Sequence, residues 1–255
     1  MKLRILYEDN HIIVVHKPAG IATQTARVGQ RDMVSEITAY LAGRARKGAL
    51  TQSKDEESRL PYVGVVHRLD QPVEGILVFA RDRQSAAALS RQIADDRMEK
   101  YYYAVICGRQ FPDQGELTDY LLKDGKTNRS RIVPKEVKGA KFAKLDYKIL
   151  KRQQAEAPEG AGKEIALAEI HLYTGRHHQI RVQMHSAGMS LLGDYKYADQ
   201  ETIRLSEQMR IKEIALCACR LEFEHPKTRR RMQFQVVPEG KSFAAFSTVI
   251  SSQAL

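Results

Sequence analysis

Short runs of apolar residues recur along the chain, and most alternate with polar residues or form compact apolar blocks that are typical of β-strands. Turn residues separate these runs, such as Asp9-Asn10 and the segment 18–20, where proline removes a ladder donor and glycine permits unusual backbone angles. Frequent strands joined by short polar turns indicate antiparallel pairing. The predicted strands span residues 3–8, 11–16, 75–81, 100–108, 141–150, 164–175, 215–226 and 230–237.

Helical spacing of the apolar residues is limited to a few segments. They are 33–41, 82–97 and 175–188. Asp82 or Ser85 can cap the second of these. The polar and highly charged segment 43–60 predicts an exposed loop. Many strands and few helices favour an α+β fold, with a long, largely antiparallel mixed sheet flanked by helices and a single domain over residues 1–255.

The charge balance indicates a polyanionic partner. The 255 residues include 41 Lys and Arg against 31 Asp and Glu, a formal net charge of +10, while 43% hydrophobic residues fit a globular protein. The basic residues cluster in segments 123–144 and 227–231. A solvated surface is the usual explanation of such runs, but two clusters together with the net charge favour contact with nucleic-acid phosphates.

Cysteine usage and the N-terminal segment predict a cytoplasmic protein without a membrane segment. Cys107, Cys217 and Cys219 are an odd number without the spacing of a disulfide framework, so we expect buried thiols in a reducing compartment. A metal pair formed by the last two is a weaker alternative. The first residues carry charges throughout, and no apolar run reaches the length of a signal peptide core or of a transmembrane helix.

The segment VVHRLDQPVEGILVFA, residues 65–80, places a carboxylate between two apolar blocks. Asp70 lies next to the Gln71-Pro72 break, where an aspartate commonly caps a turn through its own backbone. Arg68 is two residues away, and a partly buried aspartate needs a cationic partner to stay ionised. The pattern therefore leaves two readings open, a turn cap or a functional carboxylate.

A second polar cluster occurs in TGRHHQIRVQMH. One helix through this segment would stack His177, Arg181 and His185 on one face. Metal ligation is one interpretation, but no acidic residue accompanies the histidines, and polar packing or RNA contact is favoured. Arg181 lies between apolar neighbours, which predicts pairing with a carboxylate from elsewhere in the chain.

The strand segment KYYYAVICG carries three successive tyrosines. Strand geometry places Tyr101 and Tyr103 on one face and Tyr102 on the other. Core filling explains at least one of these faces. The other interpretation is an aromatic surface on which a base stacks.

Taken in order, several segments resemble the RluA-type pseudouridine synthases. They are ILYEDNHIIVVHKPAG, VVHRLDQPVEGILVFA, KYYYAVICG, TGRHHQIRVQMHSAGMSLLGDYKYA and ALCACRLEFEHPKT. The resemblance extends from Ile5 to Val237. It implies the pseudouridine synthase fold and an isomerase that converts uridine in ribosomal or transfer RNA to pseudouridine. No cofactor and no metal are implied, because the glycosidic bond that is broken is remade at C5.

The same resemblance implies roles for individual residues. Asp70 matches the catalytic aspartate, which either attacks C1′ or removes the C2′ proton, and Arg181 matches the arginine that pairs with it. Tyr102 matches the tyrosine that packs on the target uracil. Arg68 resembles the residue that fills the gap left by the extruded nucleotide, and Lys17 belongs to a motif that shapes the site. The expected contacts to substrate or RNA are Arg68, His67, Lys17, Arg176 and His178.

Two positions depart from the family pattern and point to a subgroup with the motif HRLDQPVEG. Val73-Glu74 stands where many members have a Thr-Ser or similar pair, and a histidine replaces a Thr or Ser within residues 174–178. The small RNA-binding domain that often precedes the catalytic domain is not expected here.

RNA is the expected partner, and we expect a monomer without an obligate protein partner. A noncatalytic RNA-binding factor on the same scaffold is the main alternative function. A glycosidase ranks lower, since such enzymes generally use two placed carboxyl groups and only Glu74 lies near Asp70 in the motif.

Overall fold

A computed structural model describes residues 3–27, 29–48, 60–155 and 163–253. These residues form two compact units, each of which is described by itself. The first unit comprises Met1–Met98 and Glu222–Phe234, and the second comprises Glu99–Leu221 and Gln235–Leu255.

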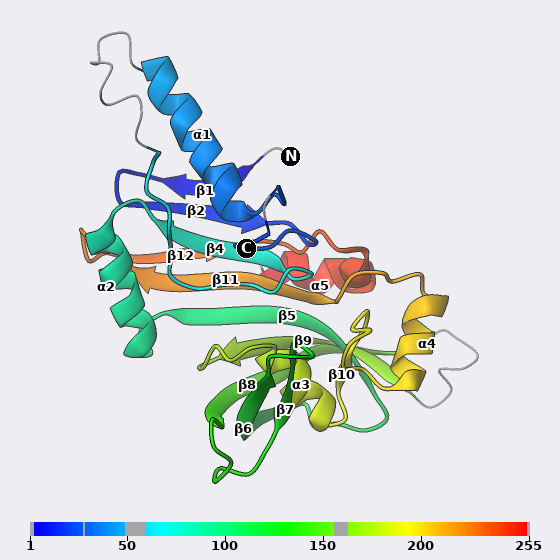
Figure 1. Cartoon of the computed structure of the whole chain (residues 1–255). Helices are drawn as coiled ribbons and strands as arrows, with labels where there is room; N and C mark the ends of the chain where they lie inside the picture. The colour runs from blue at the N-terminus through cyan, green and yellow to red at the C-terminus, as the bar shows by residue number, and fades with distance from the viewer. Residues whose placement is uncertain (1–2, 28, 49–59, 156–162, 254–255) are drawn as a thin grey trace. The chain divides into compact units, whose positions relative to one another are not determined.

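Antiparallel strands form the centre of the first unit (Figure 1). Their order is β1-β2-β4, and the short strand β3 also pairs with β4. The strands are β1 (Arg4–Glu8), β2 (Ile12–Lys17), β3 (Gly64–Val65) and β4 (Glu74–Ala80). Every residue of β2 and β4 is buried, so neither strand shows a solvent-facing side. At the turn between β1 and β2, the Asp9 carboxylate accepts hydrogen bonds from the amides of His11 and Ile12, each at 2.8 Å.

Helices α1 (Met33–Gly48) and α2 (Arg83–Ala94) complete this unit together with the strand β12 (Arg231–Gln235), whose residues up to Phe234 belong to it. Asp82 is the N-cap of α2, because its side chain accepts the amide proton of Ser85. Helix α1 is tied to β1 by the hydroxyl of Tyr40, which donates to Glu8 at 3.0 Å. Side-chain hydrogen bonds thus cap α2 and join α1 to β1.

The second unit is built on longer antiparallel strands in the order β11-β5-β9-β8-β6-β7, and β10 pairs with β5. Its strands are β5 (Glu99–Gly108), β6 (Gln114–Asp124), β7 (Arg129–Ile132), β8 (Lys141–Gln154), β9 (Glu164–Leu172), β10 (Ser190–Leu191) and β11 (Leu216–Glu224), of which β11 contributes residues up to Leu221. Tyr102 pairs with Ile170, which in turn pairs with Tyr147, so these three side chains form one row across the sheet.

Helix α3 (Gln179–Ser186) packs against β6, β7 and β10. Its Val182 forms a buried cluster with Leu121 and Ala143 of the sheet. The remaining helical elements of the unit are α4 (Gln200–Gln208), the 3-10 helix η2 (Lys241–Phe246) and α5 (Ser247–Gln253). Tyr102 therefore lies on a central strand of this sheet, β5, and Arg181 lies on the helix α3 that packs against the sheet.

The α+β class, the largely antiparallel strands and each of the predicted strands are confirmed. Three differences have physical causes. Helix α1 continues through residues 43–48 of the predicted loop, because Arg, Ala and Lys favour helix without an apolar pattern; most of the rest of that loop lies outside the described residues. Helix α3 begins only at Gln179, since His178 has a left-handed φ of 56°. Strands β6 and β7 and helix α4 were not predicted, because their apolar pattern is weak.

Gly193 provides a test of the second unit's packing. Its φ is +71°, and a Cβ atom there would lie 2.1 Å from the carbonyl oxygen of Glu213. We expect Gly193→Ala to lower the free energy of unfolding by about 2–4 kcal/mol, since strain and a main-chain clash combine. The control is Gly43→Ala in α1, where nothing lies within 4 Å of the added atom. Urea denaturation that showed equal changes for both variants would contradict this account.

Candidate active site

Asp70 lies on a loop of the first unit that is held by hydrogen bonds on both sides. Before it, the main chain of Leu69 exchanges two hydrogen bonds with the Thr23 hydroxyl, at 2.9 and 3.1 Å. After it, the carbonyl of Gln71 accepts from the Gly20 amide at 2.9 Å, and the Gln71 side chain donates back to the Gly20 carbonyl at 3.0 Å. Asp70 itself is half-buried. The loop therefore presents this carboxylate from a fixed main chain.

Lys17, at the end of β2, has a fully buried side chain beside this loop. Its ammonium group donates to the carbonyls of Pro18, Ile21 and Gln71 at 3.0, 2.7 and 3.1 Å. Burial lowers the pKa of Lys17 to about 7, while the charges of Asp70 and Glu74 act in the opposite direction. Lys17 thus joins the loop that follows β2 to the residue after Asp70.

The departure Val73-Glu74 is an interior feature. Val73 and Glu74 are 2% and 5% exposed, and the Glu74 carboxylate lies 3.8 Å from the Nε2 atom of buried His16. The negative charge of Glu74 also raises the pKa of Lys17. In place of a hydroxyl pair, this chain carries an apolar residue and a second carboxylate near the buried lysine.

His67 and Arg68 differ in exposure although they are adjacent. The ring of His67 is half-buried, and its Nε2 atom accepts the main-chain amide proton of Val78 at 3.2 Å. Arg68 is exposed. An exposed guanidinium one residue before buried Leu69 can reach a ligand, whereas the His67 ring is oriented by β4.

The tyrosines of β5 lie on alternate faces in the second unit, as the strand pattern predicts. Tyr102 is 7% exposed and pairs with Ile170. On the other face, Tyr101 stacks on His171 with ring centroids 4.4 Å apart, and Tyr103 is 1% exposed. Tyr103 therefore fills the core, and burial raises the pKa of its hydroxyl strongly.

Arg181 is buried and forms a two-pronged ion pair with Asp194. Its Nε atom donates at 2.8 Å and its Nη2 atom at 2.6 Å, and the two residues are 6% and 3% exposed. The sequence predicts a carboxylate partner for this arginine, but Asp194 was not singled out. Its place in the segment LLGDYKY, shortly after α3, is the signal that could have indicated it. The predicted pairing of Arg181 with Asp70 stays a prediction.

The histidines beside α3 do not form the predicted stack. His177 precedes the helix, and its two ring nitrogens lie 2.9 Å from the Ser130 hydroxyl and 3.1 Å from the Asn128 side chain. His185 instead lies 2.9 Å from the hydroxyl of Ser190. Because His178 is the left-handed N-cap of α3, His177 lies outside the helix and does not continue its i, i+4 row. His177 thus contacts the β6–β7 turn and the first residues of β7.

Arg176 and His178 occupy different surroundings. Arg176 is exposed, and its Nε atom donates to the carbonyl of Phe142 at 2.7 Å. His178 is largely buried, and its Nδ1 atom lies 2.7 Å from the hydroxyl of Tyr197. Burial, with Arg181 next in importance, lowers the pKa of His178 to about 2, so its ring is neutral.

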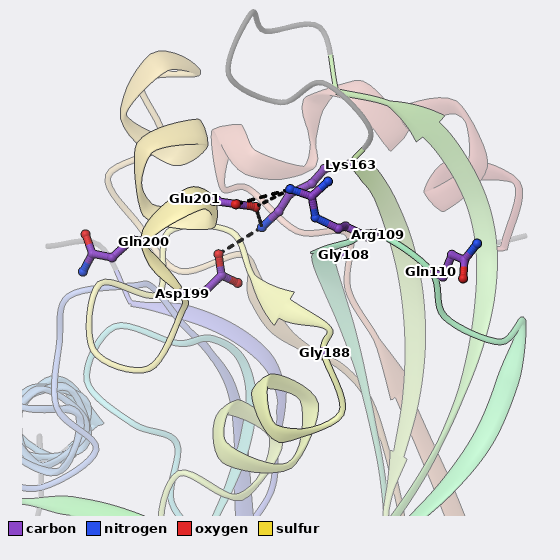
Figure 2. A pocket seen from close by; sticks show the side chains of 8 residues that line it. All are labelled: Gly108, Arg109, Gln110, Lys163, Gly188, Asp199, Gln200 and Glu201. Atoms are coloured by element: carbon purple, nitrogen blue, oxygen red, sulfur yellow. Dashed lines mark hydrogen bonds and ion pairs between the residues drawn. The ribbon is translucent and has the colours of Figure 1, made fainter.

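A pocket of about 550 Å³ in the second unit contains none of the predicted site residues (Figure 2). Lys163 pairs there with Asp199 at 2.9 Å and with Glu201 at 3.2 Å, and Arg109 also pairs with Glu201. The two cations of this pocket, Lys163 and Arg109, are thus both paired with carboxylates. The motif residues, rather than this hollow, define the candidate active site.

The described part of the chain contains neither a cluster suited to a metal ion nor a helix that could cross a membrane. Residues 3–27, 29–48, 60–155 and 163–253 contain no group of three or more His, Cys, Asp and Glu suited to a metal ion. Among the helices within those ranges, none is long and apolar enough to cross a membrane. The three cysteine side chains are buried, as the sequence predicts.

Solved structures of related shape support the fold. The chain is similar to Human RNA Pseudouridylate Synthase Domain Containing 4, with a TM-score of 0.67 and 19% identity, over 98% of this chain and 92% of that one. Human RNA Pseudouridylate Synthase Domain Containing 1 gives a TM-score of 0.65 at 19% identity, over 93% of this chain and 84% of the other. The predicted pseudouridine synthase fold is confirmed.

Sequence relatives lead to the same family. The chain is 31% identical to Uncharacterized RNA pseudouridine synthase YhcT of Bacillus subtilis, over 89% of this chain and 66% of that protein. It is 30% identical to tRNA pseudouridine synthase C of Haemophilus ducreyi, over 91% and 89% of the two chains. The family model described as RNA pseudouridylate synthase matches residues 11–186. The predicted enzyme class, an isomerase acting on uridine in RNA, is thereby confirmed, and the chain belongs to the RNA pseudouridylate synthase family.

Proposed function

We propose that this chain converts uridine to pseudouridine in ribosomal or transfer RNA, with Asp70 as the catalytic aspartate. The observation that carries the proposal is the half-buried Asp70 on a loop that Thr23, Gly20 and Lys17 hold in place. Relatives named for both substrates support the two RNA classes: one is a tRNA pseudouridine synthase, and another is Ribosomal large subunit pseudouridine synthase D of Zymomonas mobilis.

The proposed chemistry needs an ionised carboxylate at Asp70. In that form it either attacks C1′ or removes the C2′ proton, and the glycosidic bond then breaks with the uracil still bound. Arg181 would favour the charged form of Asp70, and Tyr102 would pack on the uracil and assist proton transfer at C5. The rotated base rejoins C1′ through C5, C5 then loses its proton and N1 gains one, so the isomerisation needs no oxidant, cofactor or metal.

The negative charge of Asp70 raises the pKa of Lys17, so the two side chains interact electrostatically within the first unit. Because its side chain is fully buried, we propose that Lys17 acts on the loop and that the exposed Arg68 contacts the nucleotide. Arg68 would occupy the space from which the target base is extruded. His67, Arg176 and His178 are proposed to line the RNA path.

RNA affinity is proposed to come from exposed basic residues around the turn between β6 and β7. They are Lys123, Lys126, Arg129, Arg131, Lys135 and Lys138. Ion pairs with phosphates release counterions, so this surface would bind RNA in a salt-dependent manner. We further propose a single catalytic domain that acts in the cytoplasm as a monomer.

Tritium release tests the catalytic assignment. With RNA labelled at C5 of uridine, we expect the wild type to release tritium and Asp70→Asn to lose at least about 10³-fold in rate, because the carboxylate reacts directly. RNA binding should change less than about threefold, since the substitution keeps the shape of the side chain. Comparable turnover by Asp70→Asn would remove Asp70 from its role.

Two controls separate the remaining readings of this experiment. Asp95→Asn alters an aspartate whose side chain is 50% exposed, and should leave the rate unchanged. A glycosidase would liberate uracil that keeps its tritium, whereas a noncatalytic RNA-binding factor would bind the RNA and release nothing. Either outcome with the wild type would reject the isomerase proposal for the RNA tested.

The basic surface predicts a change in salt dependence. Each phosphate contact contributes about 0.7–0.9 to the slope of log K against log salt, so Lys126→Gln with Arg131→Gln should reduce the slope by about 1.4–1.8. Exposed Lys212, on the loop after α4, supplies the control variant Lys212→Gln. An unchanged slope in the double variant, measured by filter binding, would exclude these residues from the RNA interface.

Lys17 predicts a specific pH dependence of stability. Its pKa is lowered on folding to about 7, so the unfolded chain binds more protons between pH 7 and the ordinary value of 10.5. The free energy of unfolding of the wild type, relative to Lys17→Met, should therefore rise with pH in this window, by at most about 1.4 kcal/mol per pH unit.

Buried Lys163 supplies the control for this measurement. Burial lowers the pKa of Lys163, but its hydrogen bond to Asp199 and nearby negative charges outweigh burial and raise the pKa overall. Its contribution is present below the ordinary pKa and is lost only above it, so the free energy of unfolding of the wild type, relative to Lys163→Met, should show no slope between pH 7 and 10. Urea denaturation that gave equal slopes for both variants would contradict the assignment to Lys17.

A further inference from the structure

Tyr197 contacts the same guanidinium group that Asp194 holds. The Cζ atom of Arg181 lies 5.0 Å from the centroid of the Tyr197 ring. The face of an aromatic ring attracts a cation, most strongly where water is excluded, and Arg181 is buried. Asp194 and Tyr197, both in the segment after α3, therefore contact the guanidinium group of Arg181.

The Asp194 carboxylate also sets the main chain that leads to Tyr197. Its Oδ1 atom accepts from the amides of Lys196 at 3.0 Å and Tyr197 at 3.2 Å, in addition to its bond with Arg181. One carboxylate oxygen thus fixes both the guanidinium group and the turn that carries the aromatic ring.

The Tyr197 hydroxyl extends this arrangement to two further elements. It accepts the main-chain amide proton of Ser130 in β7 at 2.8 Å and lies 2.7 Å from Nδ1 of His178, at the start of α3. Because an amide can only donate, the phenolic proton is assigned to the bond with His178. Burial raises the pKa of Tyr197, which keeps that proton in place at neutral pH.

We propose that Tyr197 is a positioning residue for Arg181, whose ring holds the guanidinium group and whose hydroxyl ties that ring to β7 and to the start of α3. The inference rests on the proposed function, since it takes Arg181 to act in the isomerisation. Strand β7 belongs to the basic hairpin proposed to bind RNA. The side chain of Tyr197 therefore connects β7, in the basic hairpin proposed to bind RNA, to Arg181.

Two variants of Tyr197 and one control test this role. Tyr197→Phe keeps the ring and removes the hydroxyl, and Tyr197→Leu removes both. Tyr195→Phe removes a hydroxyl from the same turn, one that donates to the Ile211 carbonyl. Because small misplacements of a catalytic group are costly, we expect kcat to fall about tenfold in Tyr197→Phe and about 100-fold in Tyr197→Leu, with KM nearly unchanged.

The pH profile separates positioning from a merely structural role. If Arg181 keeps the catalytic aspartate ionised, its displacement should move the acid limb of kcat/KM to higher pH in both Tyr197 variants and not in Tyr195→Phe. An unchanged kcat and pH profile in Tyr197→Phe, with only a lower melting temperature, would overturn the proposal. So would an equal loss of kcat in Tyr195→Phe.

Proton exchange at Nε of Arg181, followed by NMR in labelled protein, provides a readout that does not depend on activity. We expect slow exchange in the wild type and faster exchange in Tyr197→Phe. If Tyr197→Leu does not fold, Tyr197→Phe alone provides the test. Equal exchange rates would overturn the positioning role. Failure of the proposed function is distinguishable, because the wild type would then release no tritium while the Arg181 signal still responded to Tyr197.

Discussion

The ammonium group of buried Lys17 donates hydrogen bonds to three main-chain carbonyls. These bonds hold together the part of the first unit on which the proposed chemistry depends. A lysine that is removed from water needs hydrogen-bond acceptors around its ammonium group, because burial lowers its pKa and favours the neutral amine. One of the acceptors belongs to Gln71, next to Asp70. The need to satisfy a buried cation thus also determines where the loop with the carboxylate lies.

The second unit solves a similar problem with different groups. Arg181 is buried against Asp194, and removing one member of such a pair commonly costs about 3–5 kcal/mol because the other charge is left without compensation. Asp194 in turn orders the turn before Tyr197, and Gly193 next to it can take no side chain. The position of the arginine is therefore built into the packing of the unit rather than left to a mobile side chain.

The alternation of β5 separates two uses of tyrosine. On one face Tyr101 and Tyr103 are occupied by stacking and burial, while Tyr102 belongs to the row formed with Ile170 and Tyr147. Because consecutive side chains of a strand point to opposite faces, Tyr102 faces away from Tyr101 and Tyr103. The pocket near Lys163 contains none of the candidate site residues, and its cations are paired with carboxylates.

The sequence by itself determined most of the strand pattern, two candidates for the cap of α2 and, through motif resemblance, the family and the candidate residues Asp70, Tyr102 and Arg181. These features depend on local periodicity or on short motifs, both of which can be read along the chain. Only the tertiary structure decided which groups surround them. Thr23 and Leu69 are 46 positions apart, and Ser130 meets Tyr197 across 67. The burial of Lys17, the pairing of Asp194 and the left-handed turn at His178 arise from such distant contacts, where satisfying buried polar groups overrides local preference.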